Sequence, residues 1–502
     1  MNTGALDSKL KRIFPMCVAV VALTAPGASL ARDITLGGGI SIGYEVDDRQ
    51  YDDDDVVVPA DQGQESPPEI NNRDERYSRL RLAPLITLTS LSERDEAILR
   101  YSPSFWQDFE TSDNNLDHDL LASLDRFISR NWQVRLADRY RLSDVISNRY
   151  GDPKETDSSS DINTTGTATE DTARLSDADN RRRYWTNDLD VFSEYAYRED
   201  SKFTVGYRYG ILENVEDEDN TSEDYDRHEV LSDIGHRFNS VWKFSVFGSY
   251  VRGLFDETEA DISLADEIVE AEMDLNEYRA ATILQANFLQ YHAQSLLYSY
   301  YGADYDAEEN DDATIHDITL GWRWDISKDV IFGLGAGPTY TKTEGTEGEW
   351  GYNGNMSFSY AFERGYINFT AKRGYEVLNF TGNDENGLRE FWQSWLRFNY
   401  RLMEQLAADL YTGYRYEDEE IITEITPVAT ESVAEEEFVT EKETFNRKRF
   451  STGASLGYTF RQLYKFSLSY DYSRQDSEVL DDSFDEHRVV LTLSYETDFF
   501  KW

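Results

Sequence analysis

Residue types that often carry out catalysis are present in this chain, but their spacing builds no catalytic or metal site. No pair of histidines has the spacing of metal ligands. No Gly-x-Ser-x-Gly elbow, phosphate loop or dinucleotide fingerprint occurs where a strand-to-helix turn could hold it. The histidines are His118, His228, His236, His292, His316 and His487. A Ser/His/Asp site on a rim is the remaining catalytic alternative. We expect no enzyme, no metal site and no cofactor.

Arginine is the residue type whose spacing is informative. In "WQVRLADRYRL", residues 132–142, arginines fall on one face of a strand and apolar side chains on the other. An arginine that faced hydrocarbon at mid-depth would cost about 2–4 kcal/mol, so we expect these side chains to face an aqueous interior. The candidates are Arg79, Arg81, Arg135, Arg139, Arg141, Arg323, Arg389, Arg397, Arg401, Arg447 and Arg449. Arg208 and Arg415 fall on the same face by the same rule.

Carboxylates share the face of the arginines, which leaves two interpretations open. The acids are Asp119, Asp125, Asp188, Asp190, Glu194, Asp317, Asp325, Asp409 and Asp471. Ion pairs between the two sets would brace the wall of a wide barrel. Alternatively, arginine clusters across an interior would form a selectivity track for anionic solutes or an anionic polysaccharide.

The elements that position these side chains are strands. From about Ile34 onward, segments of ten to fifteen residues carry an apolar side chain at every second position, and none has a helical period. Clear cases are "TVGYRYGIL" (204–212), "KFSVFGSYV" (243–251) and "KFSLSYDYS" (465–473). Beyond the first 31 residues, no run of eighteen apolar residues could form a membrane helix.

The connections between the segments alternate in length. Short ones lie near 92–95, 128–131, 198–201, 239–240, 290–292, 327–329, 362–365, 403–405 and 461–463. Longer ones lie near 47–75, 110–115, 146–182, 214–226, 256–274, 306–313, 344–349, 381–387, 417–444 and 476–485. This alternation is typical of outer-membrane barrels, which have tight periplasmic turns and longer external loops.

The predicted fold is therefore all-β: a transmembrane antiparallel up-and-down β-barrel of about 20 strands, within a range of 18–22. Alternation is weakest at 110–130 and 213–240, where the count is most open to error. A soluble β-propeller or sandwich array is the alternative, but it predicts a blade-like internal repeat and no asymmetry between loops.

The first 31 residues differ from the rest of the chain. A basic start, an apolar stretch and Ser29-Leu30-Ala31 predict a cleaved signal peptide over 1–31, with a short membrane anchor as the alternative. The only cysteine, Cys17, lies within it. Residues 32–502 are expected to be a single outer-membrane barrel that begins too close to the cleavage point for a plug domain.

Negative charge is concentrated in the long connections. The formal net charge is −48, which disfavours binding to nucleic acid. Runs such as "QYDDDDVVV" within 47–75 predict a solvated acidic rim at the extracellular end. Capture of divalent cations, or bridging to the anionic lipid surface, is the functional alternative for these loops.

The chain ends on the alternating segment "VVLTLSYETDFFKW", residues 489–502. We expect this segment to be the closing strand, paired with the first strand near Ile34–Val46. Its aromatic residues fall where interfacial girdles sit. They are Tyr495, Phe499, Phe500 and Trp502.

The Tyr-rich strands "SLLYSYYGADY", "FSLSYDYS" and "LTLSYETDFF", the acidic loops and the terminal aromatic together resemble Gram-negative outer-membrane β-barrel proteins. In particular, the chain resembles β-barrel porins of this size that often accompany exopolysaccharide-export systems. The terminus resembles the aromatic signal read by the barrel-assembly machinery, with Trp502 in place of the more usual phenylalanine.

The resemblance implies location in the outer membrane, amid its lipid and lipopolysaccharide, with periplasmic polysaccharide-export components as further partners. Two functions compete: a channel for polar or anionic solutes, which includes an exopolysaccharide export channel, and a non-transporting surface barrel with acidic cation-binding loops. The oligomeric state and the cargo are left open.

Overall fold

A computed structural model describes residues 32–51, 75–143, 183–215, 224–255, 274–306, 312–344, 347–380, 387–425, 439–478 and 483–502. No helix in these residues is long and apolar enough to cross a membrane. The predicted signal peptide, most of the acidic loops and the loops near 47–75 and 146–182 lie outside the described residues.

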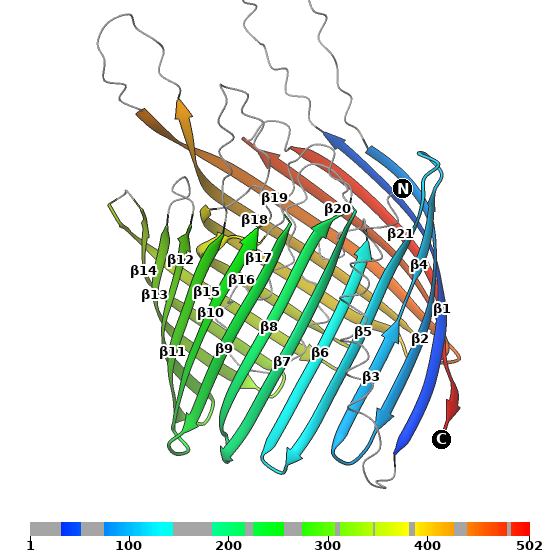
Figure 1. The fold of residues 1–502 in the computed structure, drawn as a ribbon, viewed down its shortest axis with the longest axis horizontal. Helices are drawn as coiled ribbons and strands as arrows, with labels where there is room; N and C mark the ends of the chain where they lie inside the picture. Colours follow the sequence, from blue (N-terminus) through cyan, green and yellow to red (C-terminus); the bar gives the residue numbers. More distant parts are fainter. Residues whose placement is uncertain are drawn as a thin grey trace, which may run out of the picture.

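The described residues form 21 strands, which follow one another around the molecule (Figure 1). Their bounds are β1 Asp33–Tyr51, β2 Glu75–Leu91, β3 Asp95–Tyr101, β4 Ser104–Asp108, β5 Asn114–Ser129, β6 Trp132–Ser143, β7 Tyr184–Arg198, β8 Ser201–Asn214, β9 Tyr225–Arg237, β10 Trp242–Phe255, β11 Leu275–Leu289, β12 His292–Tyr305, β13 Ala313–Ser327, β14 Val330–Thr343, β15 Glu349–Phe362, β16 Gly365–Leu378, β17 Gly387–Met403, β18 Leu406–Ile425, β19 Val439–Phe460, β20 Tyr464–Ser477 and β21 Phe484–Lys501.

The sheet closes on itself as an antiparallel barrel, which confirms the predicted fold class. β1 pairs with both β2 and β21, so the first and last strands leave no open edge. β3 and β4 share one place in the wall, because both pair with β2 on one side and β5 on the other. Pro103 interrupts this strand, since proline cannot donate to a ladder. The 21 strands therefore fill 20 positions in the wall, because β3 and β4 together fill one.

Short and long connections lie at opposite ends of the barrel. Connections of two to four residues join β2 to β3, β5 to β6, β7 to β8 and every second pair of strands after that, up to β19 and β20. They gather at one end, here called the turn end, together with the C-terminus (Figure 1). The strand ends that the longer connections join lie at the other end, here called the loop end. The predicted alternation of short and long connections is confirmed.

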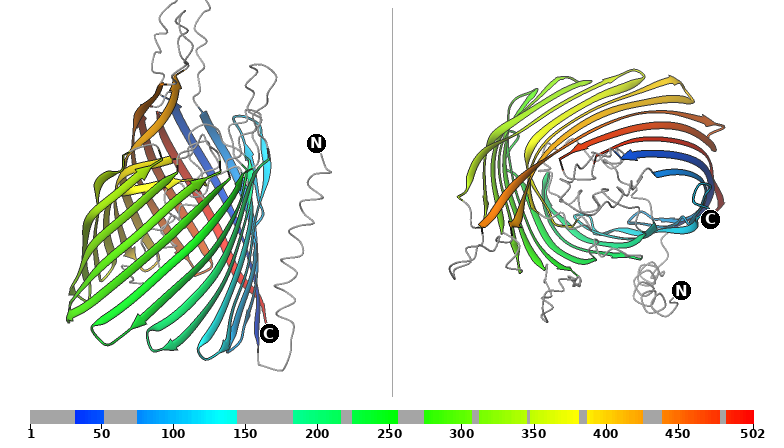
Figure 2. Two further views of the ribbon diagram at one scale, coloured as in Figure 1. Left: turned by 60° about the vertical axis from the view of Figure 1, so that its left-hand side comes forward. Right: turned by 90° about the horizontal axis from the view of Figure 1, so that it is seen from above.

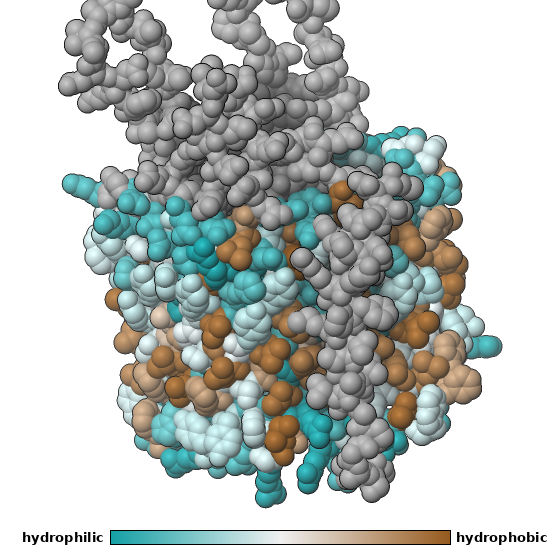
Figure 3. All heavy atoms as spheres, in the orientation of Figure 1, coloured by the Kyte–Doolittle hydropathy of each residue, from teal (hydrophilic) through white to brown (hydrophobic). Residues whose placement is uncertain are grey.

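The outer face of the wall is apolar. Large side chains at alternate positions are exposed, as Leu320 on β13 (65%) and Leu493 on β21 (49%) show. The space-filling view shows hydrophobic atoms across the wall below a hydrophilic loop end (Figure 3). Such an extended exposed apolar face fits contact with lipid rather than water.

The closing strand lies where it was predicted. β21 pairs with β1 from Thr35–Lys501 to Tyr51–Phe484. Beyond the last pair, the backbone amides of Ile34 and Trp502 each donate to the other's carbonyl, at 2.8 and 3.0 Å. The approach is close at Gly39, where a Cβ atom would lie 2.4 Å from the carbonyl oxygen of Tyr495.

One pair of neighbouring strands separates before the loop end. β15 and β16 pair only from Phe362–Gly365 to Gly354–Arg373. Residues 349–353 of β15 keep their partners on β14, and residues 374–378 of β16 keep theirs on β17, but the two segments do not pair with each other. The wall therefore splits between β15 and β16 near the loop end.

Candidate functional site in the barrel lumen

The strand register determines which side chains face the lumen. On each strand, the positions that alternate with the exposed apolar side chains point inward. For example, Leu80 and Leu82 of β2 are exposed outside, which places Arg79 and Arg81 inside. By this rule, all eleven candidate arginines occupy inward positions, as do the nine carboxylates that were grouped with them.

Five of the candidate arginines pair individually with a carboxylate on the lumen wall. The pairs are Arg79–Asp108 (3.1 Å), Arg135–Glu194 (3.6 Å), Arg139–Asp119 (3.0 Å), Arg323–Asp325 (2.8 Å) and Arg397–Asp409 (3.0 Å). Arg81 donates to the hydroxyl of Ser104, and Arg141 lies opposite Asp119 in the β5–β6 register. Arg401 is exposed near the turn end. These contacts brace the wall.

A second group converges on Glu417 of β18. Its carboxylate lies 3.9 Å from Arg389 of β17 and 3.8 Å from Arg447 of β19, and it also pairs with Arg415 of its own strand. Arg449 donates from its Nε to Gln475, at 2.7 Å. Glu417 has a side-chain exposure of 13%, so these charges interact with little screening by water.

A third group, on β8 to β11, joins Arg208 to four charged residues that are absent from the sequence candidates, Arg227, Glu229, Glu277 and Arg279. Glu229 is fully buried and pairs with Arg227 at 3.0 Å and with Arg208 at 3.5 Å. On β11, Arg279 pairs with Glu277 at 2.5 Å. The inward alternation of Arg227 with Glu229 is present in "YDRHEVL", but this segment lies where the period is weakest.

Two residues that directly follow β16 lie inside the lumen against the inner face of β9 to β12. The Asn379 amide donates to Glu277 at 2.7 Å and to the Tyr301 hydroxyl at 3.0 Å. The ring of Phe380 lies 5.2 Å from that of Tyr225 and is 5% exposed. It belongs to a buried apolar cluster with Tyr184, Leu212, Tyr225, Val251 and Leu275. The chain after β16 therefore leaves the wall and lies along the inner face of the strands that precede β15.

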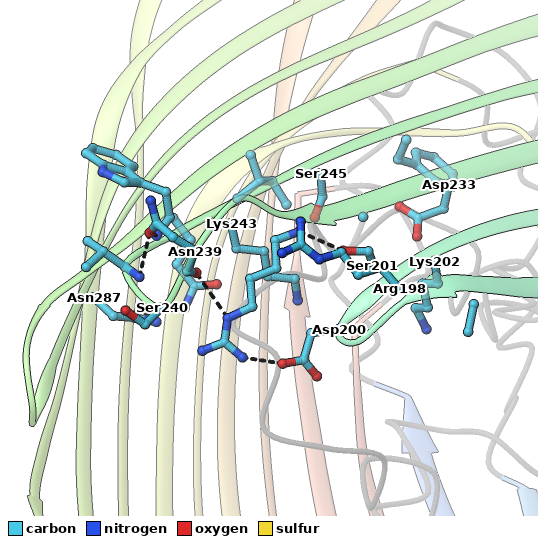
Figure 4. A pocket seen from close by; sticks show the side chains of 18 of the residues that line it. Arg198, Asp200, Ser201, Lys202, Asp233, Asn239, Ser240, Lys243, Ser245 and Asn287 are labelled. Carbon is cyan, nitrogen blue, oxygen red and sulfur yellow. Dashed lines mark hydrogen bonds and ion pairs between the residues drawn. The ribbon is translucent and has the colours of Figure 1, made fainter. Parts of the chain in front are cut away.

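Near the turn end, the lumen wall of β7 to β11 is hollowed by a cavity of about 720 Å³ (Figure 4). Its charged lining comprises Arg198, Lys202, Arg237, Lys243, Glu194, Asp200 and Asp233. Arg237 pairs with Asp200, and Lys202 pairs with Glu194 at 3.0 Å. Four cations thus face three carboxylates, in a chain whose overall charge is strongly negative.

All six histidines lie on the outer face, and each ring is hydrogen-bonded through Nδ1. A tyrosine hydroxyl contacts five of them, and the indole nitrogen of Trp322 donates to His292. The tyrosine pairs are Tyr101–His118, Tyr197–His236, Tyr207–His228, Tyr298–His316 and Tyr470–His487. Such rings, apolar in body and polar at the tip, suit the aromatic girdles of a membrane barrel.

The residues of the expected assembly signal are on the outside at the turn end. Phe499, Phe500 and Trp502 are more than half exposed. The ring of Tyr495 packs on that of Tyr464, with 5.1 Å between centroids. The terminal aromatics are therefore accessible to lipid or to a partner protein.

Searches of family models and of curated proteins find no match. Among solved structures, the siderophore receptor PirA from Acinetobacter baumannii is 8% identical, with 94% of this chain and 81% of that chain covered and a TM-score of 0.49. OpdQ from Pseudomonas aeruginosa is 8% identical, with 93% and 98% covered and a TM-score of 0.40. OccAB4 from Acinetobacter baumannii is 11% identical, with 94% and 100% covered and a TM-score of 0.39.

These neighbours are Gram-negative outer-membrane β-barrel proteins, and at such identities the likeness concerns the fold alone. The closed antiparallel wall, the apolar outer face and the separation of short from long connections define the same class for this chain. The protein has the fold of an outer-membrane β-barrel.

Proposed function

We propose that this protein is an outer-membrane channel for polar solutes, with a preference for anionic ones. The observation that carries the proposal is the contrast between the two faces of one closed wall, which is apolar outside and lined with arginines and carboxylates inside. A barrel of 20 strands is wider than the 16- to 18-stranded porins, which already hold an aqueous channel.

The preference for anions rests on the cavity at the turn end. Its four cations and three carboxylates leave an excess of positive charge at one mouth of the lumen. Elsewhere the arginines are largely paired, so they brace the wall and add less to selectivity. Lys243 and Arg198 of the cavity are the side chains we expect an anionic solute to meet first.

Export of an exopolysaccharide is the finer form of the proposal, and the sequence resemblance supports it. An acidic polysaccharide is a chain of polar, anionic units, and the charge of the turn-end cavity suits its entry from the periplasm. In this form, periplasmic polysaccharide-export components are the partners. Loss of secreted polysaccharide in a deletion strain, restored by the wild-type gene, would support export, whereas unchanged secretion would favour solute uptake.

The route to the membrane is part of the proposal. Residues 1–31 would direct export and be cleaved, and the exposed terminal aromatics would present the chain to the barrel-assembly machinery. The outer face would then contact phospholipid on the periplasmic side and lipopolysaccharide on the other. Mass spectrometry of the protein from outer membranes tests the cleavage, because the proposal predicts a chain that starts at Arg32.

Uptake by liposomes containing the refolded protein tests the solute class. The channel proposal predicts that small sugars enter, and that a sugar acid enters faster than a neutral sugar of equal size. A Lys243→Gln variant should narrow this difference, whereas Lys328→Gln, which removes an exposed lysine from a turn, should not. Liposomes that admit neither sugar would contradict the proposal.

A non-transporting surface barrel remains the second candidate, and one observation favours it. Near the loop end, the lumen holds buried groups such as Arg389 and Glu277, and Asn379 and Phe380 lie inside it. If these contacts block the lumen permanently, the acidic loops would carry the function by binding cations. Liposomes that admit no solute, together with calcium binding to the folded protein, would support this candidate.

A further inference from the structure

One arginine lies at the point where β15 and β16 separate. Arg373 is the last residue of β16 that pairs with β15. Its guanidinium donates to the backbone carbonyl of Tyr352, lies 3.5 Å from the centre of the Tyr352 ring and pairs with Glu390 at 2.5 Å. A side chain therefore occupies the place at the β15 edge that backbone donors of β16 would take in a complete wall.

Past Arg373, residues 374–380 run inside the barrel, and we call them the gate segment. Val377 packs with Ala303, Ala313 and Ile315, which face the lumen on β12 and β13. A Cβ atom on Gly351 of β15 would lie 2.2 Å from the Tyr375 hydroxyl. The outer face of the gate segment therefore lies against the inner face of its neighbours, and the view from above shows the yellow strands inside the yellow-green ones (Figure 2).

The sequence of the gate segment is nevertheless that of an ordinary wall strand. Continuing the β15–β16 register past Gly354–Arg373 would place Tyr375 beside Tyr352 and Val377 beside Trp350. Both pairs would join the apolar outer face. Glu376 and Gly374 would face the lumen. The segment therefore has the alternation required to complete the wall, although here it does not.

We propose that the gate segment is a two-position gate of the lumen. In the position seen here, Asn379 and Phe380 latch it to β9–β12 and narrow the channel. In the other position it pairs with residues 349–353 of β15, and the lumen widens. This inference rests on the proposed channel function, whose regulation it describes.

When the gate segment moves from one position to the other, the interactions that it loses are similar in kind to those that it gains, as a switch requires. The latch consists of one buried aromatic ring, hydrogen bonds that the Asn379 amide donates to Glu277 and Tyr301, and one that Asn379 accepts from the Tyr305 hydroxyl. Leaving it would allow backbone hydrogen bonds with β15 and would release Arg373 from the Tyr352 carbonyl. The side chains of Tyr375 and Val377 would leave the inner wall of the barrel and contact lipid instead.

Phe380→Ala tests the latch in planar bilayers. Because it removes the ring that fills the apolar cluster, the open position should gain population, and mean conductance should rise by about twofold or more. Phe192→Ala is the matched control, since Phe192 also faces the lumen but lies on β7, away from the latch. The control should conduct like the wild type.

A cysteine pair tests the alternative register directly. Trp350 is 74% exposed on the outer face, whereas Val377 is 5% exposed behind the wall. In the latched position, Trp350→Cys and Val377→Cys therefore lie on opposite sides of the wall and cannot bond, but in the completed wall they are directly opposed. A disulfide should form in the folded protein in membranes, form faster with Phe380→Ala, and lock the higher conductance until a reductant is added.

The outcomes separate the gate from the channel. Suppose that the wild type conducts. If Phe380→Ala then conducts like Phe192→Ala, or if the two cysteines stay reduced with and without Phe380→Ala, the gate proposal is wrong and the channel proposal stands. If no variant conducts although the disulfide forms, the channel proposal is wrong, and with it the gate as a regulator of transport. Raised conductance with a reversible disulfide lock supports both.

Discussion

Glu417 is the carboxylate on which the loop-end arginines converge. Removing its charge would leave Arg389, Arg415 and Arg447 close together without their shared partner. We expect Glu417→Gln to lower the free energy of unfolding by on the order of 3 kcal/mol, because three guanidinium groups in a poorly hydrated site would lose the carboxylate that they share. The reversal potential under a salt gradient should also shift toward anion selectivity.

Glu363→Gln is the control for this substitution, because Glu363 lies exposed in the turn between β15 and β16. It removes the same charge without touching the lumen cluster. Urea unfolding from liposomes and bilayer recordings would measure both variants. Equal unfolding free energies and equal reversal potentials for the two variants would show that Glu417 does not stabilise the arginine cluster.

At the residue scale, the sequence predicted which face of the wall a side chain occupies better than it predicted the partner of that side chain. Alternation alone placed Arg389 and Arg447 on the inner wall, but their meeting on Glu417 depends on the register between strands. Arg227 was missed because its strand lies where the period is weak. Asn379 and Phe380 gave no signal, since contact with β9 to β12 depends on the chain leaving the wall past Arg373, within β16.

At the element scale, adjacent positions on one strand should respond oppositely to the same side chain. Leu296 of β12 is exposed on the outer face, and Ser295 points into the lumen. Leu296→Arg should lower the free energy of unfolding by about 2–4 kcal/mol because it places a charge in lipid. Ser295→Arg should cost much less, and comparable losses for the two would refute the assigned orientation of the wall.

The seam between β1 and β21 makes a second prediction about elements. Gly39→Ala would bring a methyl group against the carbonyl oxygen of Tyr495, and we expect a loss of about 1–3 kcal/mol. Gly457→Ala is the control, since no atom lies within 4 Å of its added Cβ. The difference in urea midpoint between the variants measures the tightness of closure. Equal urea midpoints for the two variants would mean that β1 and β21 pack less closely than the 2.4 Å approach at Gly39 indicates.

Elements were predictable where a local pattern decides them. Two-residue alternation and turn length predicted nearly all strands and both ends of the barrel. The break between β3 and β4 follows from Pro103. The split between β15 and β16 was not predictable, because residues 374–378 carry a regular wall pattern and only their contacts inside the lumen show that they leave it.

For the whole molecule, closure depends on the last residues. Deleting Phe500–Trp502 removes the paired backbone hydrogen bonds between Ile34 and Trp502, which we expect to cost about 2 kcal/mol, together with the exposed aromatics. We expect a clear fall in the folded fraction in outer membranes, read from heat-modifiable mobility on gels. Trp502→Phe keeps an aromatic end and should assemble normally. Normal insertion of the truncated chain would contradict the assembly role.

The central claim is that the barrel conducts polar solutes through its lumen. Single-channel recording of the refolded protein in a planar bilayer tests it most directly. We predict discrete conductance steps in the wild type, a reversal potential that favours anions, and larger or more frequent steps for Phe380→Ala. A correctly folded protein that shows no steps at any voltage, with or without the Phe380 ring, would contradict the account.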